Sequence, residues 1–327
     1  MKLLARRGES AMISKDDTSI DAQSVPTITD FGRPKHALGR TTFALLILAP
    51  ALILTIGVLY PFVSAIYYSL TNFSFNNIGI SFVGFSNYVQ MFESSSFWQS
   101  VLVTVKYAVA ATAVEMVLGM SIALLLNTNS RFMKIARTLV IVPLMISPAI
   151  GTLMWQLMTN PTYGILDHYL ALVGLGHFPW GNSPNTALFS VVTIDVWIYT
   201  PFVILLALAG LQSLPQAPFE AARIDGGSGW FRFRTLTLPM LMPVLVITLV
   251  FRLMLSLQEF TIIYGLTAGG PGNTLMNLPN ASYQEGFLNL SFGPSLAYML
   301  FLWIIIYLVS QLLIVYWGKA QARAAGL

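Results

Sequence analysis

Five ionisable residues stand inside long apolar stretches of the sequence, where a charge needs either water or a partner. They are Lys106, Glu115, Asp195, Arg252 and Glu259. A charged side chain at the depth of a lipid bilayer is costly, and it usually faces a water-filled cavity or an oppositely charged group. The chemistry that this set favours is non-covalent: hydrogen bonding to a polar solute, or ion pairing between helices.

Two segments combine these charges with aromatic rings. Arg252 and Glu259 are seven residues apart, which is two helical turns, so we expect them to share a face with Ser256 between them. The other segment begins at Asp195 and continues with three aromatic residues, Trp197, Tyr199 and Phe202. Polar groups can bind the hydroxyls of a sugar, and aromatic faces can cover its ring. Together the two segments predict a carbohydrate site.

The competing interpretation is that the charges pair with one another inside a helix bundle, because buried charges are often paired structurally. We favour this interpretation for Glu115 and for Lys106, which lies near the end of its apolar stretch and can extend its ammonium group to water. Trp155 and Gln156 are weaker candidates for a position on a solute path.

Several kinds of catalytic site are missing from the sequence. There is no cysteine, which excludes thiolate chemistry, Cys-ligated metals and disulfides. His36, His168 and His177 do not have the spacing of a metal site, and neither HExxH nor GxSxG occurs. The motif G-x-x-x-x-G-K-[ST] is also missing, because the one Gly-Lys pair, at 318–319, is not followed by Ser or Thr. We expect a protein that is not an enzyme and that holds no cofactor or metal of its own.

The elements that must position these side chains are membrane helices. Apolar residues make up 56% of the 327 residues and charged residues 9%, whereas a soluble domain carries about 25% charged residues. A spanning helix needs about 20 mostly apolar residues, and six stretches reach that length: 41–68, 99–127, 133–158, 186–212, 240–265 and 295–318. The sequence predicts an all-α integral membrane protein with six spans. Its net charge of +4 does not indicate nucleic-acid binding, since no basic face interleaved with aromatic residues is present.

Lys and Arg alternate between the two sides of this bundle. Apart from Lys106 and Arg252, they occur in four segments, 1–40, 128–137, 213–239 and 319–327. The three other loops contain neither residue: 69–98, 159–185 and 266–294. Because basic loops stay in the cytoplasm, we expect the six spans to lie within 41–318, with cytoplasmic tails at 1–40 and 319–327.

The polar segment 214–239 is the longest polar interruption in the second half of the chain. Two prolines favour the start of a short helix at 219–225, and Gly226 favours its end, since glycine readily takes the left-handed C′ conformation. Ala221 and Ala222 leave a small-residue face that another protein can approach closely. The alternative is a short helix that only covers the bundle.

This segment resembles the EAA loop of ABC-importer permeases. The matching residues are Glu220, Ala221, Ala222, Asp225 and Gly226, followed by Leu236, Leu238 and Pro239. Three further pieces resemble the carbohydrate-uptake branch: FVGFSNYVQMF with FWQSVLVT at 82–104, WIYTPF at 197–202 and LTAGGPGNT at 266–274. The last is similar to the first-subunit type of the maltose permeases. Gly227 stands where the family usually has alanine.

The resemblance implies that this chain works with other proteins. A separate ATPase, which carries the ATP and Mg²⁺, would receive the short helix at five coupling positions, Glu220, Ala221, Ala222, Asp225 and Gly226. Residues 41–318 would be the permease domain, in the lipid bilayer of a bacterial inner membrane. Two such ATPase subunits, a homologous second permease subunit and an external solute-binding protein would complete the importer. The family also implies seven substrate-binding residues, which are Asp195, Trp197, Tyr199, Phe202, Arg252, Ser256 and Glu259. The sugar would cross by alternating access.

Two alternatives stay open at this point. An ion-coupled secondary transporter would use Asp195 and Glu259 as proton or ion sites. An ABC importer for glycerol phosphate or a polyol would use Arg252 for an anionic group, whereas Asp195 and Glu259 suit the hydroxyls of a neutral sugar.

Overall fold

The computed structural model describes residues 40–76, 79–128, 130–174 and 178–324. The predicted tail at 1–40, with His36, lies outside the described residues except for Arg40, and His177 also lies outside them. The chain divides into two compact units, 1–59 and 60–327. In the first unit the described segment is an apolar helix; the site described below belongs to the second.

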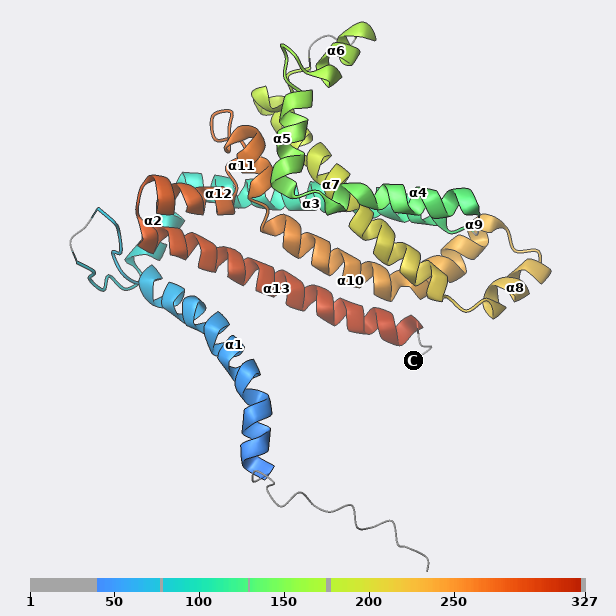
Figure 1. Cartoon of the computed structure of the whole chain (residues 1–327), viewed down its shortest axis with the longest axis horizontal. Helices are drawn as coiled ribbons and strands as arrows, with labels where there is room; N and C mark the ends of the chain where they lie inside the picture. Colours follow the sequence, from blue (N-terminus) through green and yellow to red (C-terminus); the bar gives the residue numbers. More distant parts are fainter. Residues whose placement is uncertain (1–39, 77–78, 129, 175–177, 325–327) are drawn as a thin grey trace, which may run out of the picture. The chain divides into compact units, whose positions relative to one another are not determined.

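The described residues are almost entirely helical (Figure 1), so the predicted all-α class is confirmed. Thr71 with Phe82, and Ser74 with Ser291, form isolated β-bridges. The elements are α1 (Arg40–Ser69), α2 (Ser86–Glu93), α3 (Ser95–Leu126), α4 (Arg131–Ile141), η1 (Val142–Met145), α5 (Pro148–Met158), α6 (Ile165–Leu172), η2 (Trp180–Asn182), α7 (Pro184–Ser213), α8 (Ala217–Ile224), α9 (Gly229–Arg232), η3 (Phe233–Thr237), α10 (Leu238–Leu257), α11 (Thr261–Thr267), α12 (Leu278–Tyr283), η4 (Gln284–Leu288) and α13 (Phe292–Ala324).

Five helical segments of the described chain are long and apolar enough to cross a membrane. The third predicted span, 133–158, is instead a pair of helices, Arg131–Met145 and Pro148–Met158, bent by 95°. Pro148 explains the bend, because the residue before a proline is pushed out of the helical region, and Ser147 has an extended ψ of 134°. The membrane helices therefore number five, or six if the bent pair is one span.

The fifth predicted span, 240–265, is wrong at both ends. The helix begins at Gly229, passes through η3, a single wide π turn, and ends at Leu257. Its start is fixed by the Ser228 side chain, which accepts a hydrogen bond from the Phe231 N–H at 3.2 Å. The wide turn ends at Thr237, shortly before Pro239. Because proline has no N–H to donate, a regular pattern of α-helix hydrogen bonds would be interrupted there. One helix thus joins the polar segment to the centre of the bundle.

The core of the second unit is formed by α3, α7, α10 and α13, which pack side by side (Figure 1). Small residues allow close approach where α3 crosses α7. A Cβ atom placed on Gly119 would lie 2.6 Å from the Cβ and Cγ1 atoms of Val203. The absence of a side chain at Gly119 therefore sets the distance between α3 and α7.

We expect Gly119→Ala to lower the free energy of unfolding by about 1–3 kcal/mol, because overpacking a tight contact forces the backbones apart. Thermal unfolding of the purified protein measures the change. Gly318→Ala in α13 is the matched control, since a Cβ atom there meets nothing within 4 Å. Equal unfolding temperatures for the two variants would contradict the close α3–α7 contact.

Candidate functional site

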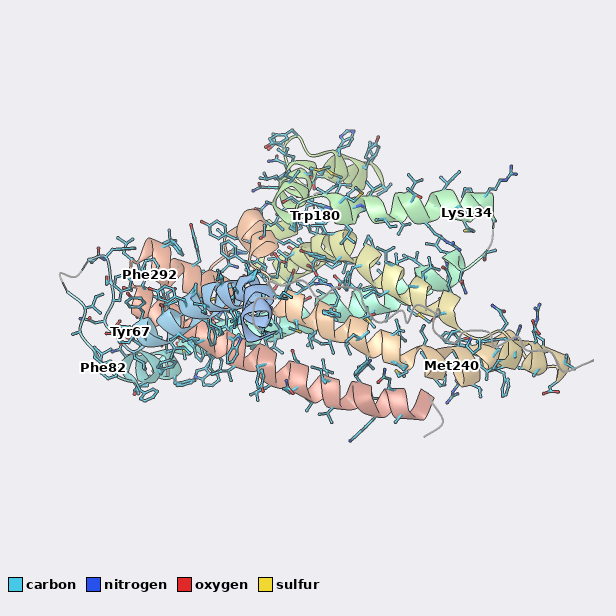
Figure 2. The ribbon with its side chains drawn as sticks, turned by 60° about the horizontal axis from the view of Figure 1, so that its bottom comes forward. Tyr67, Phe82, Lys134, Trp180, Met240 and Phe292 are labelled. Carbon is cyan, nitrogen blue, oxygen red and sulfur yellow. The ribbon has the colours of Figure 1, made fainter. Side chains whose placement is uncertain are left out.

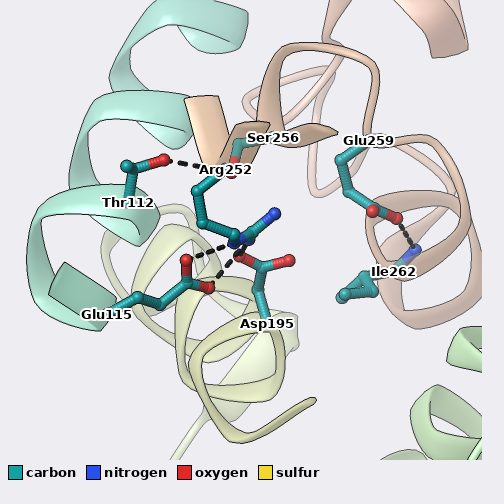
Figure 3. Close-up of polar contacts among 7 residues, drawn as sticks. All are labelled: Thr112, Glu115, Asp195, Arg252, Ser256, Glu259 and Ile262. Carbon is teal, nitrogen blue, oxygen red and sulfur yellow. Dashed lines mark hydrogen bonds and ion pairs between the residues drawn. The ribbon is translucent and has the colours of Figure 1, made fainter. Parts of the chain in front are cut away.

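Three charged side chains from three different helices meet inside the bundle (Figure 3). Arg252 of α10 donates from Nη2 to Oε1 of Glu115 in α3 at 2.7 Å and to Oδ2 of Asp195 in α7 at 2.5 Å. Its Nε donates to the other Glu115 oxygen, so that the Arg–Glu contact is bidentate. All three residues are 0% exposed. This cluster, which we call the Arg252 cluster, ties α3, α7 and α10 together.

Further contacts support the Arg252 cluster. The guanidinium carbon of Arg252 lies 4.3 Å from the centre of the Tyr199 ring, which is a cation–π contact. The hydroxyls of Thr112 in α3 and Ser256 in α10 are hydrogen-bonded at 3.2 Å. With two carboxylates and one guanidinium, the cluster has a formal charge of −1. The arrangement buries polar groups between the helices, and among these described residues no nucleophile is paired with a general base.

Glu259 does not share a helical face with Arg252, because α10 ends at Leu257. It lies in the break before α11, where its Oε1 accepts a hydrogen bond from the Ile262 N–H at 2.7 Å. Its own carbonyl oxygen accepts from Nδ2 of Asn277 at 2.5 Å. The prediction of a shared face assumed an unbroken helix through this point and is wrong. Glu259 is nevertheless buried, as Ser256 is.

The three aromatic residues predicted on α7 divide between two surroundings. Tyr199 and Phe202 lie four and seven residues after Asp195, which places them on the same face of α7. Tyr199 contacts Arg252 of the cluster. Trp197 instead lies with its ring centre 6.0 Å from that of Trp155 in α5. The role of the seven residues as substrate contacts stays a prediction. The structure brings three of them together, since Arg252 contacts both Asp195 and Tyr199.

Glu115 belongs to the Arg252 cluster, although the sequence analysis did not place it with Arg252. Its assignment to an interhelical ion pair agrees with the structure, but its partner is the same Arg252 that was assigned to the substrate. The sequence did contain a signal for this contact. Two apolar stretches carry one acidic residue each, Glu115 and Asp195, and a third carries Arg252. Lys106, the other residue assigned a structural role, is exposed.

The predicted short helix is confirmed as α8, which begins two residues earlier than expected. Its end is a Schellman motif: Gly227 N–H donates to the Ala222 carbonyl at 2.8 Å, and Gly226 N–H to the Arg223 carbonyl at 3.2 Å. Gly226 has a φ of +77°, which glycine adopts without steric cost. A Cβ atom on Gly227 would lie 2.7 Å from the Ala222 oxygen. An alanine at 227 would therefore need a different helix end.

The five predicted coupling positions do not share one environment. Glu220 lines a cavity between α8 and the ends of the spans, together with Arg223. Ala221 is exposed, and Ile224 beside it is 86% exposed, although isoleucine is normally a core residue. Ile224 was not among the predicted coupling residues. Its exposure defines an outward apolar face of α8 that another protein could cover.

The described residues thus form an apolar helix bundle with a buried polar cluster inside and an exposed short helix at one end. Residues 115–316 match the family described as "Binding-protein-dependent transport system inner membrane component", and the chain belongs to this family. It is therefore a multi-pass membrane permease, as its motifs predicted.

Named relatives agree with this membership. The trehalose/maltose transport system permease protein MalF of Thermococcus litoralis is 41% identical over 197 residues, which cover 60% of this chain and 67% of that protein. The sulfoquinovosyl glycerol transport system permease protein SmoG of Agrobacterium fabrum is 32% identical over 268 residues, covering 81% and 87%. A bacterial ABC transporter that imports the acidic polysaccharide alginate has the same fold, with a TM-score of 0.70 at 21% identity, covering 87% and 96% of the two chains.

Proposed function

We propose that this chain forms part of the solute path of an ATP-driven importer for a carbohydrate. Its partners are a homologous second permease subunit, two ATPase subunits that hold the nucleotide, and an external solute-binding protein. Family membership supports the importer, and the carbohydrates in the names of MalF and SmoG support the solute class.

The observation that carries the proposal is the connection from α8 to the Arg252 cluster. Ile224 gives α8 an exposed apolar side chain that a partner protein can cover. A short turn, 225–228, joins α8 to the helix Gly229–Leu257, on which Arg252 lies. A displacement of α8 by an ATPase is transmitted along this helix to the contacts that hold α3 and α7.

Alternating access then requires the Arg252 cluster to open. Asp195, Arg252 and Ser256 are buried here, so this conformation keeps them from solvent. Separation of α10 from α3 and α7 exposes their polar groups to a solute, as expected for a site between moving helices near the bilayer midplane. The cluster serves as an interhelical tie when closed and as a source of hydrogen-bonding groups when open.

The basic residues support an orientation with α8 on the cytoplasmic side. The start of α4 and the short helices α8 and α9 lie at the same end of the bundle (Figure 1). Lys and Arg in these elements are Arg131, Lys134, Arg137, Arg223 and Arg232. Basic loops stay in the cytoplasm, so both termini are cytoplasmic in this proposal.

The charge of the cluster favours a neutral solute. Arg252 is engaged by two carboxylates, and the formal charge of −1 repels an anion. The second candidate is an anionic carbohydrate, which the name of SmoG favours and which would displace Asp195 or Glu115 from Arg252. A thermal-shift screen of the partner binding protein against neutral and acidic sugars distinguishes the two.

Reconstitution in proteoliposomes tests the proposal as a whole. We expect uptake of a radiolabelled sugar only when this chain, the second permease, the ATPase and the binding protein are present with ATP. Ile224→Asp should abolish uptake, because it places a charge on the outward apolar face of α8. Uptake driven by an ion gradient in the absence of the ATPase would show a secondary transporter and contradict the importer.

A further inference from the structure

A polar cavity of about 470 Å³ lies between α8 and the ends of the spans, separate from the Arg252 cluster. Four α8-side residues line it at positions i, i+3, i+4 and i+7: Gln216, Phe219, Glu220 and Arg223. Arg232 contributes from α9. Because the exposed Ile224 is not among the lining residues, this cavity is distinct from the outward face of α8.

The cavity has more hydrogen-bond donors than the protein satisfies. Two arginines and one glutamate line it, which gives a formal charge of +1. Neither Arg223 nor Arg232 forms an ion pair with another described residue, and Nε of Arg232 is buried with no hydrogen-bond partner among them. A guanidinium presents five donors in a planar fork that matches a phosphate. These unpaired donors indicate an anionic ligand.

The rest of the lining combines three leucines with Asn127 and Thr237. The leucines are Leu124 from the end of α3, and Leu211 and Leu214 from the end of α7. The ends of spanning helices lie at the depth of the lipid headgroups. Trp230, two residues before Arg232, is 68% exposed, as expected for an aromatic residue at the membrane interface. A cationic mouth beside leucines at this depth suits a ligand with a phosphate head and an apolar tail.

A basic amphipathic helix adjoins the cavity. Arg137 of α4 donates from Nη2 to the carbonyl oxygens of Leu126 at 2.7 Å and Thr128 at 3.2 Å, on either side of the cavity residue Asn127. None of α4 is buried, and Lys134 points away from the bundle at the end where Met240 lies (Figure 2). Basic amphipathic helices at this depth attract anionic lipids.

We propose that this cavity binds the phosphate group of an anionic phospholipid, with Arg223 and Arg232 as its ligands. Glu220 disfavours a ligand with a larger negative charge, and a phosphodiester carries only one. The bound lipid lies between α8 and the spans, so the lipid composition of the membrane regulates how firmly α8 is held. The site takes no part in the solute path and does not depend on which sugar is carried.

Native mass spectrometry of the purified full-length chain tests the site. The chain is titrated in detergent with phosphatidylglycerol, phosphatidylcholine or inorganic phosphate. We expect phosphatidylglycerol to be retained in preference to phosphatidylcholine, and R223Q/R232Q to weaken its binding at least about tenfold through loss of two charge-assisted contacts. Thermal unfolding without lipid shows whether the double variant folds.

R234Q is the matched control, because Arg234 is exposed in η3 and is not among the cavity residues. Equal phosphatidylglycerol binding by wild type and R223Q/R232Q would overturn the site. An equal loss in R234Q would assign the binding to surface charge in general and would also overturn it. Retention of inorganic phosphate without preference for phosphatidylglycerol would identify a free-anion site instead of a lipid site.

Discussion

Arg252→Met should destabilise the protein by about 3–5 kcal/mol, because it leaves two carboxylates buried without their counter-charge. Glu115 and Asp195 are both 0% exposed, so water cannot replace the guanidinium without opening the bundle. Equilibrium unfolding in mixed detergent measures the loss. Arg252→Lys should fall between wild type and Arg252→Met, since an ammonium group cannot reproduce the bidentate contact.

Lys106→Met is the matched control, because it removes the same charge from an exposed position of α3. We expect it to change stability by less than about 0.5 kcal/mol. If Lys106→Met and Arg252→Met unfold alike, the Arg252 cluster does not hold the helices together.

A neutralised cluster separates the structural role of Arg252 from its predicted role as a substrate contact. In the triple variant Glu115→Gln, Asp195→Asn, Arg252→Met, no uncompensated charge remains, and we expect much of the stability to return. Uptake by this folded variant should stay low if the charged groups bind the solute. Normal uptake would show that Arg252 acts only as an interhelical tie.

The second large effect is expected at Gly226, where Gly226→Val should reduce transport at least about tenfold while the chain still inserts and folds. A φ of +77° is strongly unfavourable for a β-branched residue and costs about 1–2 kcal/mol or more. The Schellman end of α8 then opens, and the outward face with Ile224 changes direction. A loss of 1.4 kcal/mol in ATPase docking corresponds to about a tenfold loss of affinity.

Gly229→Val is the control, because Gly229 lies three residues away, has no positive φ and has open space around its Cα atom. Coupled ATP hydrolysis and sugar uptake in proteoliposomes are the readouts. Wild-type coupling in both variants would mean that the geometry of the α8 end does not matter for transport.

Local features were predictable from the sequence, and contacts between distant segments were not. Gly226 marks the end of α8 because the αL requirement is a property of a few neighbouring residues. The contact of Glu115 with Arg252 joins residues 137 positions apart, and no local pattern specifies it. The bend at Pro148 was also missed, although the proline was visible, because an apolar stretch with a proline can either kink or span.

The substrate-site prediction illustrates the same limit. The spacing of seven residues predicted that Glu259 lies two helical turns from Arg252 on the same face. Such a spacing places two residues on one face only if both lie in the same helix, and α10 ends at Leu257. The sequence signal for that end is weak, since Gln258 is neither glycine nor proline. Tertiary contacts, such as the bond from Asn277 to the Glu259 carbonyl, decide where the helix stops.

The unbroken helix Gly229–Leu257 has a consequence for how the chain can vary in length. Each residue added within it would turn Arg252 by about 100° about the helix axis, away from Glu115 and Asp195. An insertion of one turn would restore the angle but shift the guanidinium by about 5 Å along the axis. Insertions and deletions that preserve the buried contacts are therefore confined to the turn before Ser228 and to the segment after Leu257.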